Sequence, residues 1–144
     1  MKLLVINGPN MNMLGIRQPD IYGKSTYADL VEYIASHCSK RGVEVDFYQS
    51  NHEGDLVDKI QQAYGVYDGI AMNAAAYTHT SVAIADAIAA VAIPTVEVHI
   101  SNVMGREEYR HVSYMKKNCI AVCAGRGFDS YIDAVELLIK HTDS

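Results

Sequence analysis

The chain has 144 residues, of which 49% are hydrophobic and 20% are charged, with a formal net charge of −5. This length predicts one domain, residues 1–144, with a sizeable core. The negative charge disfavours a general nucleic-acid binder, and no apolar run approaches the length of a membrane span. The charge instead favours a small-molecule partner. The three cysteines are odd in number and lie in predicted helix or strand interiors, which suggests reduced, buried thiols in a cytoplasmic protein, and they have no zinc-type spacing.

The first half of the chain predicts two strands and two helices. KLLVIN, residues 2–7, is a continuous apolar run typical of a central strand buried on both faces. A long polar loop follows, and Ser25 or Thr26 can cap a helix that ends near Lys40. VEVDFYQSN then alternates apolar and polar residues, which predicts a strand near a sheet edge, and a second helix covers residues 51–64. His52 and Glu53 at its start are expected to form a cap rather than a metal pair.

Residues 67–102 predict a strand, a helix and a second strand that runs parallel to the first. DGIAMN and AIPTVEVHIS are the strands, and Thr80 or Ser81 can cap the helix between them. The expected inward positions of that helix recur at helical spacing and are Val82, Ala85, Ile88, Ala89 and Ala92. A basic segment, a strand at CIAVCAG and a helix over residues 129–141 complete the chain.

This alternation of five strands with helices predicts an α/β fold of three layers. The expected sheet is a flavodoxin-like, doubly wound parallel sheet in the order 2-1-3-4-5, with its switch point between the first and third strands. In such folds ligands bind beyond the carboxyl ends of the strands. Those ends carry two polar groups, Asn73 with Tyr77, Thr78 and His79, and Glu97 with His99, Ser101 and Asn102.

Glu97 and His99 are two residues apart on a predicted strand, so both side chains point to the same face. The carboxylate can therefore orient or charge the imidazole. The loop over residues 7–26 leaves the carboxyl end of a central strand and overlooks the same crevice. It is interpreted as an active-site lid, with an inert Ω-loop as the alternative.

Several chemistries are disfavoured by the pattern. NGPN and AGRGF lack the spacing of a nucleotide-binding fingerprint, so no cofactor is indicated. Two alternatives stay open: a metal-dependent hydrolase using His79 and His99, and a non-catalytic flavodoxin-like module that binds a flavin or a signalling partner. Acid–base chemistry remains, in which Tyr22 would need a cation such as Arg17 to lower a pKa that is ordinarily about 10.

Competing structural roles exist for the candidate residues of this acid–base site. Tyr22 could be a loop aromatic that packs on the surface. Arg106 and Arg110, beside Glu107 and Glu108, could form ordinary surface ion pairs. His99 next to Glu97 would be the complementary acid.

Five segments together resemble those of type II 3-dehydroquinate dehydratases, in the same order and over essentially the whole chain. They are NGPNMNMLGIRQPDIYG, QSNHEG, the run from Asn73 through Tyr-Thr-His-Thr-Ser-Val-Ala, EVHISN and REEYRHVSY. The resemblance implies the flavodoxin-like fold and the reversible dehydration of 3-dehydroquinate to 3-dehydroshikimate. This is an anti-elimination through an enolate in the shikimate pathway, without metal, cofactor or Schiff base.

The resemblance also implies which residues carry the reaction. Tyr22 matches the base that removes a proton beside the substrate ketone, and Arg17 matches the lid arginine that lowers the pKa of that tyrosine. Asn10 matches the residue that steadies the enolate through water. His99 matches the acid that protonates the departing hydroxyl, and Glu97 orients it.

Substrate contacts and assembly follow from the same resemblance. The matching contacts are Asn73, His79, Ile100, Ser101 and Arg110, with the backbone amides of Ile100 and Ser101 receiving the substrate carboxylate. Asp86 matches a residue that reaches a neighbouring subunit's site, and Arg106 is a further basic residue of the segment. The family forms trimers that assemble into dodecamers, so a homododecamer is expected here.

Two departures from the family pattern stand out. The family often has Gly or Pro after the position of Asn73, whereas this chain has Ala74-Ala75-Ala76, which could tighten the loop if a left-handed backbone is needed. The lid reads Arg17-Gln18-Pro19 where Glu commonly precedes the proline.

Overall fold

The computed structural model describes residues 1–16, 20 and 24–143. Its centre is one sheet of five strands in the order β2-β1-β3-β4-β5, and every neighbouring pair is parallel. This confirms the predicted topology. The strands are β1 Lys2–Asn7, β2 Glu44–Gln49, β3 Gly69–Asn73, β4 Thr95–His99 and β5 Ala121–Ala124.

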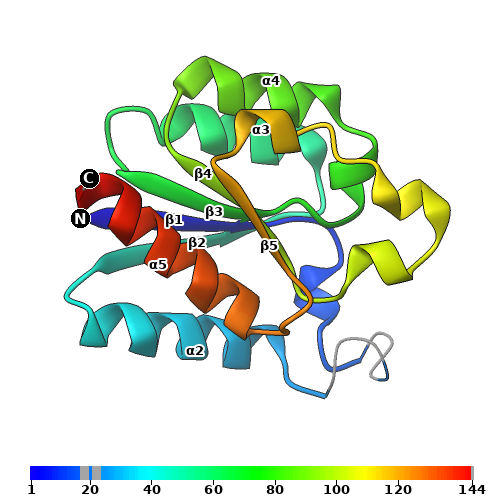
Figure 1. Ribbon diagram of the computed structural model, residues 1–144, viewed down its shortest axis with the longest axis horizontal. Coiled ribbons are helices and arrows are strands. Elements are labelled where there is room, and N and C mark those ends of the chain that lie inside the picture. Colours follow the sequence, from blue (N-terminus) through cyan, green and yellow to red (C-terminus); the bar gives the residue numbers. More distant parts are fainter. Residues whose placement is uncertain (17–19, 21–23, 144) are drawn as a thin grey trace.

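Helices cover both faces of the sheet (Figure 1). One face carries α2 Tyr27–Lys40 and α5 Asp129–Asp143, and the other carries α3 Glu53–Gln62 and α4 Val82–Val91. Thr26 begins α2 with a capping box, in which its side chain and that of Asp29 bond each other's backbone N–H groups. Ser81 caps α4 by accepting the N–H of Ile84.

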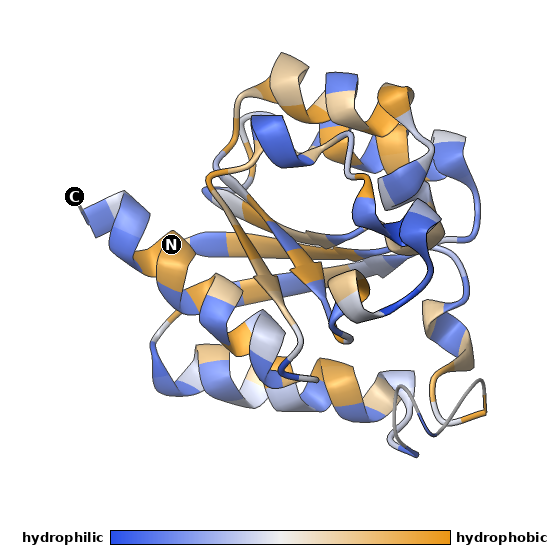
Figure 2. Ribbon diagram, turned by 45° about the vertical axis from the view of Figure 1, so that its right-hand side comes forward, coloured by the Kyte–Doolittle hydropathy of each residue, from blue (hydrophilic) through white to orange (hydrophobic). Residues whose placement is uncertain are grey.

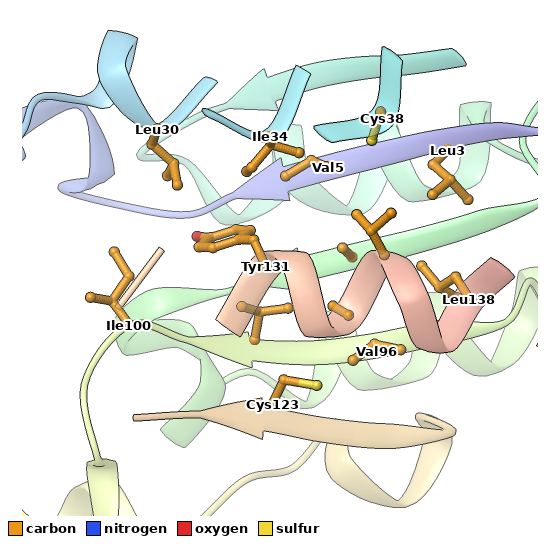
Figure 3. Packing of buried hydrophobic residues seen from close by; sticks show 14 of the residues in the cluster. Leu3, Val5, Leu30, Ile34, Cys38, Val96, Ile100, Cys123, Tyr131 and Leu138 are labelled. Atoms are coloured by element: carbon orange, nitrogen blue, oxygen red, sulfur yellow. The ribbon is translucent and has the colours of Figure 1, made fainter. Parts of the chain in front are cut away.

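Two apolar cores result from the alternation of side chains along the buried strands. Figure 2 shows hydrophobic residues along the strands and the helices that cover them. Leu3 and Val5 of β1 face α2 and α5, whereas Leu4 and Ile6 face α3 and α4. Figure 3 shows the first core, where the Tyr131 ring of α5 is fully buried. β2, at the sheet edge, is only partly buried, as its alternating sequence predicts.

Short 3-10 helices gather beyond the carboxyl ends of β1, β3 and β4 (Figure 1). They are η1 Met11–Met13, η2 Ala75–His79, η3 Val103–Gly105 and η4 Glu108–His111, and a further turn, η5 Lys116–Asn118, precedes β5. The loop after β1 was expected to be polar, but Met11 and Leu14 in it are buried in the core. Within the described ranges, no helix is long and apolar enough to cross a membrane.

The inward face predicted for α4 is partly wrong. Ala85 and Ile88 are buried as expected, but Val82 is 54% exposed and Ala89 and Ala92 are also exposed. The buried set is Ile84, Ala85, Ala87, Ile88 and Val91. Apolar residues, many of them alanine, occur on all sides of α4, so their spacing alone does not show which face is buried.

Candidate active site

An open pocket lies beyond the carboxyl ends of β1, β3 and β4, and encloses about 590 Å³ including its mouth. Its lining includes most of the residues that the sequence singles out: Asn10, Asn73, His79, His99, Ile100, Ser101, Arg106 and Arg110. Pro9, Met11, Leu14, Ala75, Ala76 and Val103 complete the wall. Polar groups from segments far apart in sequence therefore converge at the predicted sheet edge.

Asn10 reaches the pocket through a tight backbone arrangement after β1. The Gly8 N–H donates to the carbonyl of Asn73 (2.8 Å), which ties the loop to β3. Asn10 itself has a left-handed backbone with φ 69°, and its N–H donates to Oδ1 of Asn51 (2.9 Å). Gln49 supports the same turn by donating to the Gly8 carbonyl (3.1 Å). Gln49, the last residue of β2, and Asn51 thus hold the loop that presents Asn10.

Glu97 and His99 form a buried pair, as the spacing predicts. Nε2 of His99 lies 2.6 Å from Oε2 of Glu97, and the two residues are 5% and 3% exposed. Burial raises the pKa of Glu97, but hydrogen bonds from His99 and Ser113 and the nearby positive charge outweigh it, so the net shift is downward. The carboxylate is ionised and can only accept, hence Nε2 of His99 carries a proton and Nδ1 is left for a ligand.

Ser113 was not singled out by the sequence. Its hydroxyl donates to Oε1 of Glu97 at 2.6 Å, so both oxygens of this carboxylate are engaged. Ser113 lies 16 residues after Glu97, in the segment between η4 and η5. It belongs to the REEYRHVSY segment of the family resemblance, but no periodicity places its side chain against the strand, which is why sequence reasoning missed its role.

His79 has one defined ring orientation. Its Nδ1 lies 2.7 Å from the backbone carbonyl of Val112, which can only accept, so Nδ1 carries the proton. Burial lowers the pKa of His79, and the nearby charges of His99 and Arg110 lower it further. The ring is therefore neutral near pH 7, and Nε2 is an acceptor on the pocket wall. The His79 and His99 rings are stacked, with centroids 6.5 Å apart.

Asn73 belongs to a buried amide and phenol network under the pocket. Its Nδ2 donates to the Tyr131 hydroxyl (3.0 Å), and its Oδ1 accepts the N–H of Ala75 (3.0 Å). The Tyr131 hydroxyl in turn donates to Oδ1 of Asn7. Burial raises the pKa of Tyr131, so the phenol stays neutral and serves as a hydrogen-bonding support.

Arg106 and Arg110 line the pocket and also pair with Glu107. Nε of Arg110 lies 2.8 Å from Oε2 of Glu107, and Nε of Arg106 lies 3.8 Å from the same oxygen. Both guanidinium side chains are largely buried, with 12% and 16% exposure for Arg106 and Arg110. Each arginine therefore has two roles: it forms an ion pair with Glu107, and it lines the pocket.

Two of the described residues that the sequence predicts for the site do not line the pocket, Glu97, which contacts His99, and Asp86. Asp86 is exposed on α4 and does not line it. Tyr22 and Arg17 lie outside the described residues. His52 stands at the start of α3 as predicted, but its side chain makes no capping hydrogen bond; Ser50 instead accepts its N–H and donates to Asp55.

The part of the chain that the structure describes holds no group of three His, Cys, Asp or Glu side chains that could bind a metal ion. His79 and His99 approach each other, but one nitrogen of each ring is already bonded to Val112 or Glu97. Of these described residues, the pocket offers an imidazole pair, amides, backbone groups and guanidinium groups. These suit proton transfer and anion binding.

Comparisons with known proteins agree with this geometry. The model of the family described as Dehydroquinase class II matches residues 1–139. The chain belongs to this family. Among its relatives, the 3-dehydroquinate dehydratase of Fusobacterium nucleatum is 54% identical over 144 residues, and the alignment covers 98% of each chain. That of Clostridium acetobutylicum is 52% identical over 138 residues and 96% of each chain.

Solved structures of class II dehydroquinases share the fold as well. The crystal structure of type II dehydroquinase from Butyrivibrio crossotus superposes with a TM-score of 0.94 at 52% sequence identity, covering 96% of this chain and 97% of that one. The chain thus spans nearly the full length of these relatives.

One of the three alanines that follow Asn73, where the family often has Gly or Pro, has an unusual backbone conformation. Ala75 has a left-handed backbone with φ 53°, in the turn that follows Asn73. Such a conformation is disfavoured for a residue with a Cβ atom. The loop accepts it because the Ala75 N–H bonds to Oδ1 of Asn73.

Proposed function

We propose that this protein is a hydro-lyase that converts 3-dehydroquinate to 3-dehydroshikimate through an enolate, in the shikimate pathway. Its membership of the Dehydroquinase class II family supports this reaction, and so do relatives named 3-dehydroquinate dehydratase along the whole chain. The observation that carries the proposal is the buried Glu97–His99 pair opening on a pocket with two arginines. It combines an oriented imidazole with groups that suit a carboxylated substrate.

The first step assigned is removal of a proton from the carbon beside the ketone. Tyr22 is proposed as the base and Arg17 as the cation that lowers its pKa, by their match to the family's lid segment. The electron pair left behind forms an enolate, whose negative charge Asn10 would stabilise through a water molecule. The left-handed turn that brings Asn10 to the pocket wall supports this role.

The second step assigned is loss of the hydroxyl group, which leaves as water. His99 is proposed to give the departing oxygen a proton from Nδ1, the nitrogen that its bond to Glu97 leaves for a ligand. The enolate then re-forms the ketone and pushes out the leaving group, so the charge returns to neutral. The imidazole enters this step with a proton on each ring nitrogen: Nε2–H stays on Glu97, and Nδ1–H passes to the departing oxygen, which leaves the neutral Nε2–H form.

Substrate binding is assigned to groups at the ends of β3 and β4. The backbone amides of Ile100 and Ser101, with Arg110 nearby, are proposed to receive the substrate carboxylate. Neutral His79 offers Nε2 as an acceptor for a substrate hydroxyl, since Nδ1 donates to Val112. Asn73, held by Tyr131, would contact the substrate as well.

A homododecamer built from trimers is proposed as the assembly, in the cytoplasm, where the free thiols of all three cysteines stay reduced. Asp86 would then act in a neighbouring subunit's site, and its exposed position on α4 outside this chain's own pocket supports that role. Val82 on the same helix is 54% exposed, which suits burial against another copy. Analytical ultracentrifugation checks the assembly, and a monomer in solution would contradict it.

The test of the reaction is direct. Purified protein is mixed with 3-dehydroquinate in the presence of a chelator, and formation of the conjugated product is followed by ultraviolet absorbance. We expect turnover that the chelator leaves unchanged. Absence of product, or product formation only without chelator, would reject the proposal, the latter in favour of a metal-dependent enzyme.

The base is tested with Tyr22→Phe, which should abolish turnover but retain substrate binding. Tyr64→Phe is the matched control, because Tyr64 is 72% exposed and does not line the pocket. Arg17→Ala should raise the pKa of the base and so move the rise in activity to higher pH. Arg126→Ala, whose side chain is 61% exposed, is its control and should keep the wild-type profile.

A further inference from the structure

Ser113 sits behind the proposed acid rather than in the pocket. Its hydroxyl donates to Oε1 of Glu97 at 2.6 Å, while Oε2 of the same carboxylate accepts from His99 at 2.6 Å. The Ser113 oxygen also accepts the backbone N–H of Lys116 at 3.2 Å. The hydroxyl proton is therefore directed at Glu97, because the other side of the oxygen is taken by the Lys116 amide.

The residues on either side of Ser113 bind η2, the helix that carries His79. The Val112 carbonyl accepts the His79 Nδ1–H at 2.7 Å, and the Tyr114 N–H donates to the Thr78 carbonyl at 3.1 Å. Three consecutive residues thus bond to the groups around the pocket. Hydrogen bonds of both neighbouring residues fix the backbone at Ser113, so its hydroxyl has a defined position relative to Glu97.

We propose that Ser113 is a positioning residue for the reaction: its hydroxyl fixes the Glu97 carboxylate, which in turn holds His99 with Nε2–H toward Glu97 and Nδ1 toward the substrate. The proposal rests on the proposed function for its kinetic part. The terminal torsion of a glutamate side chain is broad, so one hydrogen bond alone leaves the carboxylate free to turn. Two donors, one on each oxygen, fix its plane and with it the direction of the imidazole.

The chain offers a matched control in Ser50. Its hydroxyl also donates to a carboxylate, Asp55 at 2.8 Å, and accepts a backbone N–H, that of His52 at 3.0 Å. Ser50 does not line the pocket. Losing the hydroxyl at either position removes the same kind of contact, so a difference between the two variants measures the effect on the site rather than on folding.

The kinetic experiment compares Ser113→Ala, Ser113→Thr and Ser50→Ala with the wild type, using 3-dehydroquinate as substrate. We expect Ser113→Ala to lower kcat by about 10- to 100-fold, because misplacement of a reacting group has effects of this order. KM should change by less than about twofold, as substrate contacts are retained. Ser113→Thr, which keeps the hydroxyl, should restore most of kcat, and Ser50→Ala should keep the wild-type value.

A second readout needs no substrate. In protein labelled with ¹⁵N at histidine, the ring nitrogen shifts of His99 report which nitrogen carries the proton. We expect one dominant Nε2–H form in the wild type and in Ser113→Thr, and a mixture of forms in Ser113→Ala. Wild-type protein without dehydratase activity would reject the proposed function, whereas this spectrum still decides the role of Ser113.

The proposal is overturned if Ser113→Ala keeps the wild-type kcat and the wild-type His99 spectrum. It is also overturned if Ser113→Ala and Ser50→Ala lose activity equally, since the effect would then come from folding. Thermal unfolding of each variant identifies such a loss. Should Ser113→Ala not fold, Ser113→Cys replaces it, because a thiol is a weaker donor of similar size; unchanged kcat in that variant would reject the proposal.

Discussion

The two ends of the parallel strands carry the same kind of contact in different surroundings. We call the side of the sheet where the strands begin the amino edge, and the side where they end the carboxyl edge. At the amino edge the Tyr67 hydroxyl donates to Asp46 at 2.6 Å, and at the carboxyl edge the Ser113 hydroxyl donates to Glu97 at 2.6 Å. The Asp46 side chain is 51% exposed and pairs with Lys2, whereas the Glu97 side chain is 4% exposed and pairs with His99. Water competes with the first contact and not with the second.

The difference teaches that polar residues at strand ends do not by themselves mark a site. What separates the two edges is burial together with convergence on a pocket. At the carboxyl edge the buried bonds of Ser113 and His99 to Glu97 fix His99, which faces the pocket. At the amino edge each group can exchange its partner for water, so a lost contact has a small effect.

Among substitutions that compare the two edges, the largest expected effect follows from Glu97→Gln. Two donors, Ser113 and His99, point at the two oxygens of Glu97, and an amide offers only one acceptor atom in their place. One donor must face the NH₂ group, so His99 loses its orientation or its preferred tautomer. We expect kcat to fall by about 100-fold or more, measured with 3-dehydroquinate. A variant with near wild-type kcat would show that burial at this edge is not linked to catalysis.

The same substitution changes how stability depends on pH. The pKa of Glu97 lies below its ordinary value of 4.5 in the folded protein, because bonds from His99 and Ser113 and nearby charge outweigh burial. A lowered folded pKa stabilises the protein above the unfolded pKa, and this stability is lost as the pH falls through the folded pKa. The midpoint temperature of thermal unfolding should therefore fall less steeply as the pH drops below 4.5 in Glu97→Gln than in the wild type.

Glycine positions give the next comparison between the edges. A Cβ atom on Gly8, at the carboxyl edge, would lie 2.5 Å from the backbone carbonyl oxygen of Ala74, whereas one on Gly65, before β3, would meet nothing within 4 Å. Gly8→Ala must therefore push the Asn10 loop away from β3, and we expect a loss of about 3 kcal/mol in the free energy of unfolding. Gly65→Ala adds only left-handed strain at φ 76°, about 1 kcal/mol. Urea denaturation measures both, and equal losses would contradict the tight packing of the carboxyl edge.

Two left-handed alanines sharpen the comparison further. Ala75 lies in the pocket wall and Ala92 follows α4 at the amino edge, and both have φ 53°. Ala→Gly at either position relieves strain but frees the unfolded chain, so we expect a net gain of up to about 1 kcal/mol from each. Only Ala75→Gly should also change KM, because it loosens the turn that follows Asn73. Identical KM values for both variants would show that this turn does not set substrate binding.

The sequence was sufficient for most of the fold. Continuous apolar runs in the central strands, alternation in β2, and capping residues such as Thr26 and Ser81 each depend on neighbouring residues, so local patterns predict them. The face of α4 could not be predicted, because a helix that is apolar on all sides is oriented by its packing partners.

The site divides in the same way. Glu97 and His99 share a strand, so period-two geometry alone predicts their contact. Ser113, Tyr131 and Gln49 reach the site through tertiary packing, over sequence separations that no local pattern spans. The sequence predicts only that the alanines tighten the loop if a left-handed backbone is needed. That Ala75 has this backbone could not be predicted, because a positive φ is set by the hydrogen bonds of the turn.

The smallest expected effect lies at the amino edge, with Tyr67→Phe. The Tyr67 hydroxyl is the first cause of the lowered pKa of Asp46, while burial and then Asp46 raise the pKa of Tyr67 to about 12. Removal of the Tyr67 hydroxyl returns the pKa of Asp46 toward 3.8. The variant therefore loses a contribution to the free energy of unfolding that is present above this pH and absent well below it. Because Asp46 is exposed and keeps Lys2 as a partner, we expect a change of at most about 1 kcal/mol near pH 7 and an unchanged kcat. Thermal unfolding and the dehydration assay, run beside Ser113→Ala, check both; a fall in kcat comparable to that of Ser113→Ala would mean that the two edges are coupled through the sheet.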